Sequence, residues 1–191
     1  MGTLMESWPR RHRITVDEYY RMAEVGLLAS DARVELIEGE VIDMAPIGSE
    51  HGSVVDQLTH LLTRAVGGQA IVRVQGAVRL SRMSEPEPDV ALLKPRADFY
   101  RHEQPTGSDT LLIIEVSDST LRYDREIKVP LYARHGVPEV WIVDLRNSRV
   151  LFHRSPVAGE YKNQTSAAQP GATPIASLPD VTVDLSRLLP S

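Results

Sequence analysis

The chain has 191 residues, a formal net charge of −5 and no cysteine, and these properties exclude several classes of protein. Without cysteine there are no disulfides and no thiolate metal sites, which fits a reducing compartment. An acidic chain has no overall attraction for nucleic acid and is not typical of a dedicated DNA-binding module, although a local basic groove can coexist with it. No apolar run approaches the roughly 20 residues of a membrane span, and no apolar segment follows the basic N-terminal residues as in a secretory signal. We therefore expect a cytoplasmic protein.

The length favours one domain and is sufficient to bury a sizeable core without disulfides or structural metals. We expect a flexible N-terminus over residues 1–12 and a single domain over residues 13–191. No repeat period is visible along the chain, so a solenoid or propeller is not indicated.

The N-terminal third predicts a helix, a hairpin and a second helix. Thr15 followed by Glu18 predicts a capping box at the start of a helix over residues 16–25. Apolar residues on both sides of Glu38–Gly39 predict a β-hairpin with a tight turn. In residues 49–66 the apolar positions recur at spacings of three and four, which predicts an amphipathic helix.

The remainder of the chain predicts a β-rich centre. Apolar and β-branched runs predict strands at residues 70–74, 77–80, 89–93, 110–114, 140–143 and 149–153. Residues 124–135 have a helical pattern, in which Pro130 predicts a kink or a start close to the first turn. The stretch 155–174 is rich in Gly, Pro, Ala and Gln and is expected to be a loop. The order of elements indicates a mixed α/β architecture.

Three charged residues stand where a hydrophobic core has little use for them. Asp89 begins a predicted strand, Glu115 directly follows the apolar strand 110–114, and Lys128 lies on the next predicted helix. Two carboxylates on adjacent strands tolerate each other only with a cation between them or a shared proton. Mg²⁺ binds one or two carboxylates together with water and phosphate oxygens, and a nearby ammonium could orient the attacking water or stabilise negative charge. We therefore expect a metal cation, and not a salt bridge, to offset Glu115.

Each of these residues also has a structural interpretation. Asp89 could cap a turn after a proline, and Lys128 could be an ordinary exposed helix lysine. Glu115 could pair with an arginine such as Arg79 or Arg122. The metal-site hypothesis rests on the three residues together and not on any one of them.

Other polar and aromatic residues are assigned to the framework. Asp124 fits a helix N-cap better than a metal ligand. Tyr132 and Trp141 fit the core, with no stacking on nucleobases implied. His51 and His60 lie nine residues apart on one predicted helix, about half a turn out of phase, so they do not form a metal-binding pair.

The segments ELIEGEVIDMAP, EPDVALL, IIEVSDST and DREIKVPLYARHGVPEVWIVDL follow one another in an order and spacing that resemble the Uma-type endonuclease family, within the PD-(D/E)XK nuclease superfamily. The resemblance runs from residue 14 to residue 189. It implies a restriction endonuclease-like α/β (α+β) fold, with a central mixed sheet flanked by helices and an N-terminal helix and hairpin. It also implies hydrolysis of phosphodiester bonds by a metal-activated water, with Mg²⁺ or Mn²⁺ as cofactor and DNA as the expected polymer.

The resemblance assigns roles to particular residues. It implies Asp89 and Glu115 as metal ligands, with the carbonyl of Val116 as a third ligand. The superfamily usually has its lysine two residues after the second acid, where this chain has Ser117 instead. The Uma-type pattern places that lysine on the following helix, at Lys128.

Two further site residues are drawn in by the same resemblance. Glu35, in the hairpin, would supply another acid, and His51 would relay a proton or contact phosphate. Their structural interpretations are a solvated hairpin face for Glu35 and a local hydrogen bond near a helix N-terminus for His51.

Two alternatives belong to other functional classes. A catalytically inactive nuclease-like domain could bind nucleic acid or a protein partner, and the acidic charge and Ser117 favour this interpretation. Hydrolysis of a small phosphoester or nucleotide is the other alternative, although the sequence contains no motif for nucleotide recognition. A homodimer that cuts both strands of DNA is a further expectation from the nuclease architecture.

Overall fold

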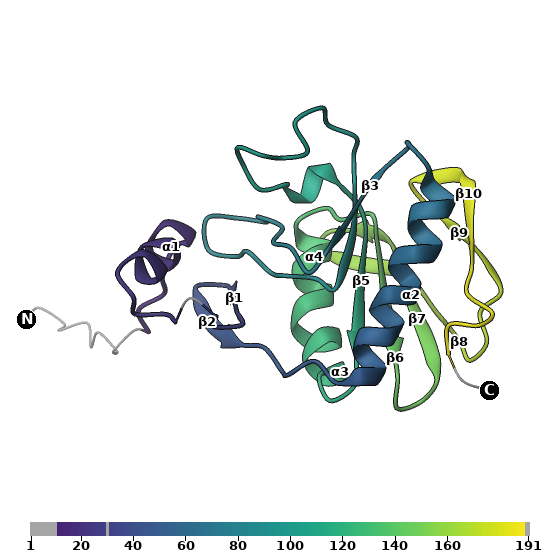
Figure 1. The fold of residues 1–191 in the computed structure, drawn as a ribbon, viewed down its shortest axis with the longest axis horizontal. Helices are drawn as coiled ribbons and strands as arrows, with labels where there is room; N and C mark the ends of the chain where they lie inside the picture. The colour runs from purple at the N-terminus through teal and green to yellow at the C-terminus, as the bar shows by residue number, and fades with distance from the viewer. Residues whose placement is uncertain (1–10, 30, 190–191) are drawn as a thin grey trace, which may run out of the picture.

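The computed structural model describes residues 11–29 and 31–189, and Figure 1 shows a β-sheet between helices. Of the expected flexible N-terminus, residues 1–10 lie outside the described part. The helices are α1 (Val16–Glu24), α2 (Ser49–Val66), α3 (Leu121–Tyr123) and α4 (Val129–Arg134). Two short turns are also helical, a 3₁₀ turn (Gly107–Asp109) and a π-helical turn (Asp124–Lys128). No helix of the described ranges is long and apolar enough to cross a membrane.

The strands form one large sheet and two small ones. The large sheet has six strands in the order β3 (Ile71–Val74), β4 (Val90–Leu93), β5 (Thr110–Ser117), β6 (Glu139–Asp144), β7 (Arg149–Val157) and β8 (Glu160–Ala167). The two-stranded sheets are β1 (Val34–Ile37) with β2 (Glu40–Asp43) and β9 (Ala172–Ile175) with β10 (Leu178–Asp184). Only β5 and β6 are parallel within the large sheet, and the other neighbours are antiparallel. The expectation of a central mixed sheet flanked by helices is confirmed.

Alternating residues of the sheet build a core on each face. In β5, Leu112 and Ile114 pack in the cluster that contains the apolar face of α2, while Ile113 packs in the cluster that contains α4. Side chains alternate between the two faces of a strand, so Glu115 has the same orientation as Ile113. The carboxylate of Glu115 therefore lies on the face that α4 covers.

The N-terminal helix and hairpin form as expected. Thr15 and Glu18 make the capping box of α1, and the turn between β1 and β2 has positive φ angles at Glu38 (49°) and Gly39 (80°). A connecting segment ahead of β4 holds the hairpin, because the amide of Glu85 donates to the carbonyl of Leu36 at 2.7 Å. This tie fixes β1 relative to the large sheet, although the two sheets share no ladder.

One expected strand, residues 77–80, does not form. The amide of Val78 donates to the carbonyl of Pro86, and the amide of Arg79 donates to the carbonyl of Pro105. These partners lie on two different segments, so both amides are hydrogen-bonded although no regular β-ladder forms.

The prediction of a loop over residues 155–174 is wrong, because β7 runs to Val157 and β8 follows it. Within β8 only Tyr161 is buried and most other side chains are exposed. An edge strand whose side chains face water on both sides lacks the apolar alternation by which strands are recognised.

The helix expected at 124–135 is split at the position that Pro130 predicts. The amide of Val129 donates to the carbonyl of Asp124, a spacing of five residues that defines the π-helical turn. Pro130 lies in the first turn of α4, where its missing N–H costs little. Turns of this kind are frequent at functional sites, and this one ends at Lys128.

A buried histidine on β7, His153, makes the stability of the fold depend on pH. His153 is 6% exposed, and both ring nitrogens lack a hydrogen-bond partner among the described residues. Burial, with a smaller contribution from the guanidinium of Arg125, lowers the pKa of His153 from 6.5 to about 4. The unfolded chain therefore binds a proton more readily than the folded one, so stability is full above pH 6.5 and falls as pH falls toward 4.

Replacing His153 with leucine should remove much of this acid sensitivity, which amounts to about 2–3 kcal/mol. Urea denaturation at neutral pH and near pH 4 measures how much the free energy of unfolding changes between the two pH values. His60→Gln, at an exposed histidine, is the control, and its pH dependence should match that of the wild type. If the stability of His153→Leu depends on pH as that of the wild type does, the acid sensitivity does not come from His153.

Candidate functional site

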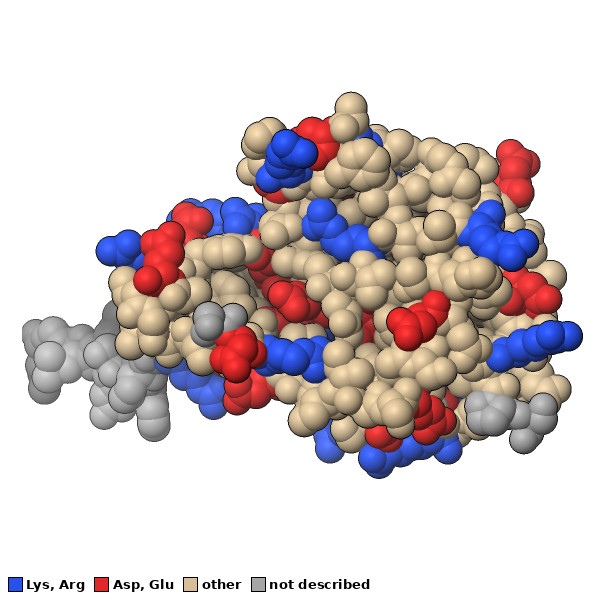
Figure 2. Space-filling model, viewed as in Figure 1, with Lys and Arg blue, Asp and Glu red and all other residues tan. Residues whose placement is uncertain are grey.

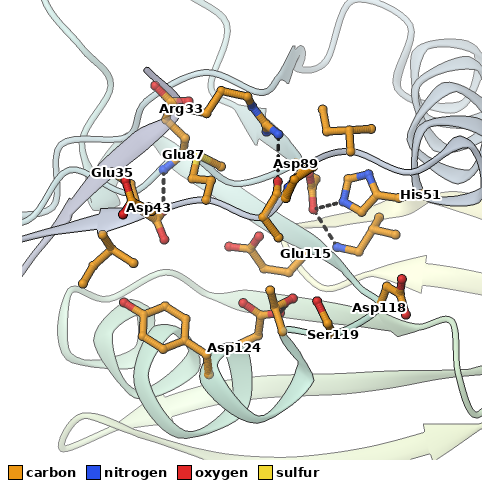
Figure 3. A pocket seen from close by; sticks show the side chains of 18 of the residues that line it. Arg33, Glu35, Asp43, His51, Glu87, Asp89, Glu115, Asp118, Ser119 and Asp124 are labelled. Carbon is orange, nitrogen blue, oxygen red and sulfur yellow. Dashed lines mark hydrogen bonds and ion pairs between the residues drawn. The ribbon is translucent and has the colours of Figure 1, made fainter. Parts of the chain in front are cut away.

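The site is a cavity of about 280 Å³ between the hairpin, the first turn of α2, the start of β4, the end of β5 and the π-helical turn (Figure 3). All five residues expected to act in catalysis line it, namely Glu35, His51, Asp89, Glu115 and Lys128. The structure therefore brings together residues that are far apart in the sequence.

Lys128 lies between two carboxylates at the base of this cavity. Its Nζ is 2.8 Å from Glu115 Oε1 and 3.1 Å from Glu35 Oε2, and the three side chains are at most 5% exposed. The expectation that no salt bridge offsets Glu115 is wrong. Arginine partners for Glu115 are also excluded, because Arg79 pairs with Glu85 and Arg122 pairs with Glu126.

Glu35 reaches the site from β1 and is held by the backbone. The amide of Glu87 donates to Glu35 Oε2 at 3.1 Å, and this is the oxygen that Lys128 contacts. All four residues of β1 are buried, so a solvated hairpin face is not the environment of Glu35. The pairing of Glu35 with Lys128 depends on how the hairpin docks on the sheet, which local sequence patterns do not reveal.

Glu115 does not follow its strand, as was expected, but lies within it. β5 continues to Ser117, because Glu115, Val116 and Ser117 pair with β6 in a parallel ladder. The antiparallel pairing with β4 ends earlier, at Val90 opposite Ile114. On that side the backbone of Val116 is free of β4, and its amide donates to Asp89 Oδ2 at 2.8 Å.

Asp89 is held in place by two donors on one oxygen. In addition to the amide of Val116, His51 Nε2 lies 3.2 Å from Asp89 Oδ2, as the dashed lines of Figure 3 show. The hydrogen bond to Asp89 raises the pKa of His51, while burial opposes the shift. His51 is thus placed against the candidate metal ligand from the first turn of α2.

Tyr132, which the sequence interpretation assigned to the core, also contacts a residue of the cavity. Its side chain is fully buried, but its hydroxyl donates to Glu115 Oε1 at 2.5 Å. Lys128 contacts the same oxygen. Tyr132 follows Lys128 by four residues, a spacing that puts two helical side chains on one face. That spacing was the available signal.

Ser117 and Asp124 form a separate buried contact. Ser117 ends β5, and its hydroxyl donates to Asp124 Oδ2 at 2.7 Å. The hydroxyl of Thr120 donates to the same oxygen at 2.7 Å. Asp124 is therefore not the helix N-cap that was expected, because the structure places it at the start of the π-helical turn with its carboxylate in the cavity lining.

The cavity carries an excess of acidic groups. Burial raises the pKa of Glu115 to about 8; the ammonium of Lys128 opposes this, and Asp124, Asp89 and Glu35 add to it. Burial likewise raises the pKa of Asp124. For Lys128, burial alone would lower the pKa, but Glu115 and its neighbours raise it well above the usual value. One buried ammonium therefore faces several carboxylates, an imbalance that an added cation would relieve.

The donor set fits a hard divalent cation. Asp89 and Glu115 each accept hydrogen bonds from the protein through one oxygen. Among the described residues, no group donates to Asp89 Oδ1 or to Glu115 Oε2. No three His, Asp or Glu side chains of the described ranges are arranged to hold a metal ion together. A site here would use two carboxylates, the Val116 carbonyl and water, which matches the few protein ligands that Mg²⁺ takes.

Acidic side chains are also visible on the molecular surface near the hairpin. Figure 2 shows acidic side chains in the recess beside the N-terminal helix and hairpin, with basic and acidic residues interspersed over the rest of that face. No extended basic patch dominates the visible face. Binding of a polyanion at the recess would therefore depend on neutralisation of the acidic groups there.

Comparisons with known proteins agree with the fold. The crystal structure of a putative nuclease belonging to DUF820, from Anabaena variabilis, is similar to this chain with a TM-score of 0.69. The two are 16% identical, and the similarity covers 92% of this chain and 97% of the other, which shows a shared fold. No curated protein matched the chain. The family described as "Putative restriction endonuclease" matches residues 16–186, nearly the whole chain. The chain belongs to this family, Uma2.

Proposed function

We propose that this protein is a metal-dependent endonuclease that hydrolyses phosphodiester bonds in DNA. Membership of a nuclease family and the fold shared with a nuclease support the reaction class. The observation that carries the proposal is the buried ammonium of Lys128 between Glu35 and Glu115, beside Asp89 in a single cavity. A purely structural core has no need for one lysine and three acids in a single cavity, because burying charged groups is costly.

Asp89, Glu115 and the carbonyl of Val116 are the groups that would hold Mg²⁺ or Mn²⁺. The ion would supply a bound water of lowered pKa and a Lewis acid for the phosphoryl oxygens. The protein's own contribution is to hold the two carboxylates rigidly: Asp89 through Val116 and His51, and Glu115 through Lys128 and Tyr132. Such outer contacts fix ligand orientation.

Lys128 would act on the substrate and on the attacking water. Its ammonium is held by Glu35 as well as by Glu115, so it would remain fixed when the Glu115 carboxylate engages a cation. From that position it can donate a hydrogen bond to negative charge that develops on phosphate oxygens. Glu35 is then a positioning residue for Lys128.

His51 would hold Asp89 and offer its second nitrogen to the reaction. Nε2 is engaged with Asp89, whereas Nδ1 is buried without a partner among the described residues. For Nδ1 to relay a proton or contact a phosphate oxygen, the buried imidazole ring would have to turn toward the cavity when substrate binds.

Cleavage of supercoiled plasmid in the presence of Mg²⁺ or Mn²⁺ tests the proposed function. We expect nicked and then linear DNA, with no product when EDTA removes the metal. Parallel incubations with single-stranded DNA and with mononucleotides define the substrate class.

Two results would point to other functions. Folded protein that binds plasmid but cuts nothing in either metal would favour an inactive nuclease-like binding domain. Hydrolysis of mononucleotides without any cleavage of polymers would favour a small-molecule phosphoesterase.

A further inference from the structure

We propose that Tyr132 is a positioning residue for metal binding, whose hydroxyl fixes the Glu115 carboxylate so that Oε2 remains available to the cation. This inference rests on the proposed function, because it concerns the same metal site.

Both protein contacts of the Glu115 carboxylate are made to the same oxygen. The Tyr132 hydroxyl donates to Oε1 at 2.5 Å, and Lys128 Nζ lies 2.8 Å from that same oxygen. A carboxylate held through one oxygen by two donors cannot rotate freely about its last bond. Glu115 Oε2 is thereby directed away from both donors, toward the cavity that Glu115 lines.

The position of Tyr132 on its helix makes this possible. Lys128 ends the π-helical turn and Tyr132 lies one turn further on, in α4. Residues four apart on a helix share a face, so both donors point at β5. Ile113 and Glu115 are on the face of β5 that α4 covers, which brings the acid under the two donors.

Packing alone does not explain the hydroxyl. The ring of Tyr132 lies in an apolar cluster with Val129, Ala133 and Ile142, which a phenylalanine ring would fill equally well. A buried hydroxyl costs free energy unless it is hydrogen-bonded, and this hydroxyl donates to Glu115.

Tyr161 supplies a matched control. It is also buried, at 3% exposed, and its hydroxyl donates at 2.7 Å to the backbone carbonyl of Val137. Tyr161→Phe and Tyr132→Phe therefore each remove one buried hydroxyl and keep the ring, but only Tyr132→Phe removes a contact to a candidate metal ligand.

The experiment is calorimetric titration of each folded variant with Mn²⁺, together with thermal melting and the Mn²⁺ dependence of plasmid nicking. We expect Tyr132→Phe to weaken Mn²⁺ binding by about tenfold, as other outer contacts to metal ligands do. Tyr161→Phe should bind Mn²⁺ as the wild type does, although both variants melt at lower temperature. Nicking by Tyr132→Phe should recover at high Mn²⁺ concentration.

Mn²⁺ binding by Tyr132→Phe tests the role of the tyrosine, whereas Mn²⁺ binding by the wild type tests the proposed metal site. If Tyr132→Phe binds Mn²⁺ with the wild-type affinity and only melts earlier, Tyr132 is a structural residue and the inference is overturned. If the folded wild-type protein binds no Mn²⁺, the proposed metal site itself is overturned.

Discussion

Replacing Glu115 with glutamine is expected to lower metal-dependent cleavage of plasmid DNA by at least about 1,000-fold, because a metal ion supplies several kcal/mol of transition-state stabilisation. Glutamine keeps the size of the side chain and an oxygen for Tyr132 and Lys128 to contact. What it removes is the negative charge that a divalent cation needs. The measurement is the initial rate of nicking at saturating Mg²⁺, by wild type and variant purified in parallel.

The control for Glu115→Gln is Glu160→Gln. Glu160 is exposed on β8 and pairs only with Lys162 in the described structure, so its neutralisation should leave the rate unchanged. If Glu115→Gln cuts as fast as the wild type, the nuclease activity does not originate in this cavity. Contamination by another nuclease would produce the same rate in both variants.

Replacing Lys128 with methionine is expected to destabilise the fold by about 3–5 kcal/mol, the usual cost of removing one partner from a buried ion pair. Methionine can fill the space, but Glu35 and Glu115 would then face each other without the ammonium that lies between them. Urea denaturation measures the loss. Cleavage should also fall, because the donor to developing phosphate charge is gone.

A double variant isolates the electrostatic part of this loss. Lys128→Met with Glu115→Gln removes both the cation and one of its acids, so it should be more stable than Lys128→Met alone. Lys162→Met is the exposed control, and it should change stability by less than about 0.5 kcal/mol. If the double variant is less stable than Lys128→Met, the charge of Glu115 does not interact with Lys128 as the distances indicate.

The sequence predicts those parts of the fold whose signals are local. The capping box at Thr15 and Glu18, the turn at Glu38–Gly39 and the helix over 49–66 form as expected, because neighbouring residues determine them. Strand β8 was missed because its side chains are mostly exposed and its pairing with β7 is held by backbone hydrogen bonds.

The sequence indicated which residues would line the candidate site, but it did not indicate which of them contact one another. Spacing and family resemblance indicated Asp89, Glu115 and Lys128, which the structure brings to one cavity. The ion pair of Lys128 with Glu35 could not be predicted, because it depends on the docking of the hairpin against the sheet. The contact of Tyr132 with Glu115 was not predicted, because an aromatic residue at helical spacing is more often core than site.

Anomalous diffraction from crystals of this protein soaked in Mn²⁺ would show whether a metal ion binds in the cavity. We expect an anomalous peak between the carboxylates of Asp89 and Glu115, near the carbonyl of Val116, with Lys128 still in contact with Glu35. A saturated crystal with no peak in this cavity, and with Lys128 unchanged between Glu35 and Glu115, would contradict the assignment of a metal-dependent nuclease site.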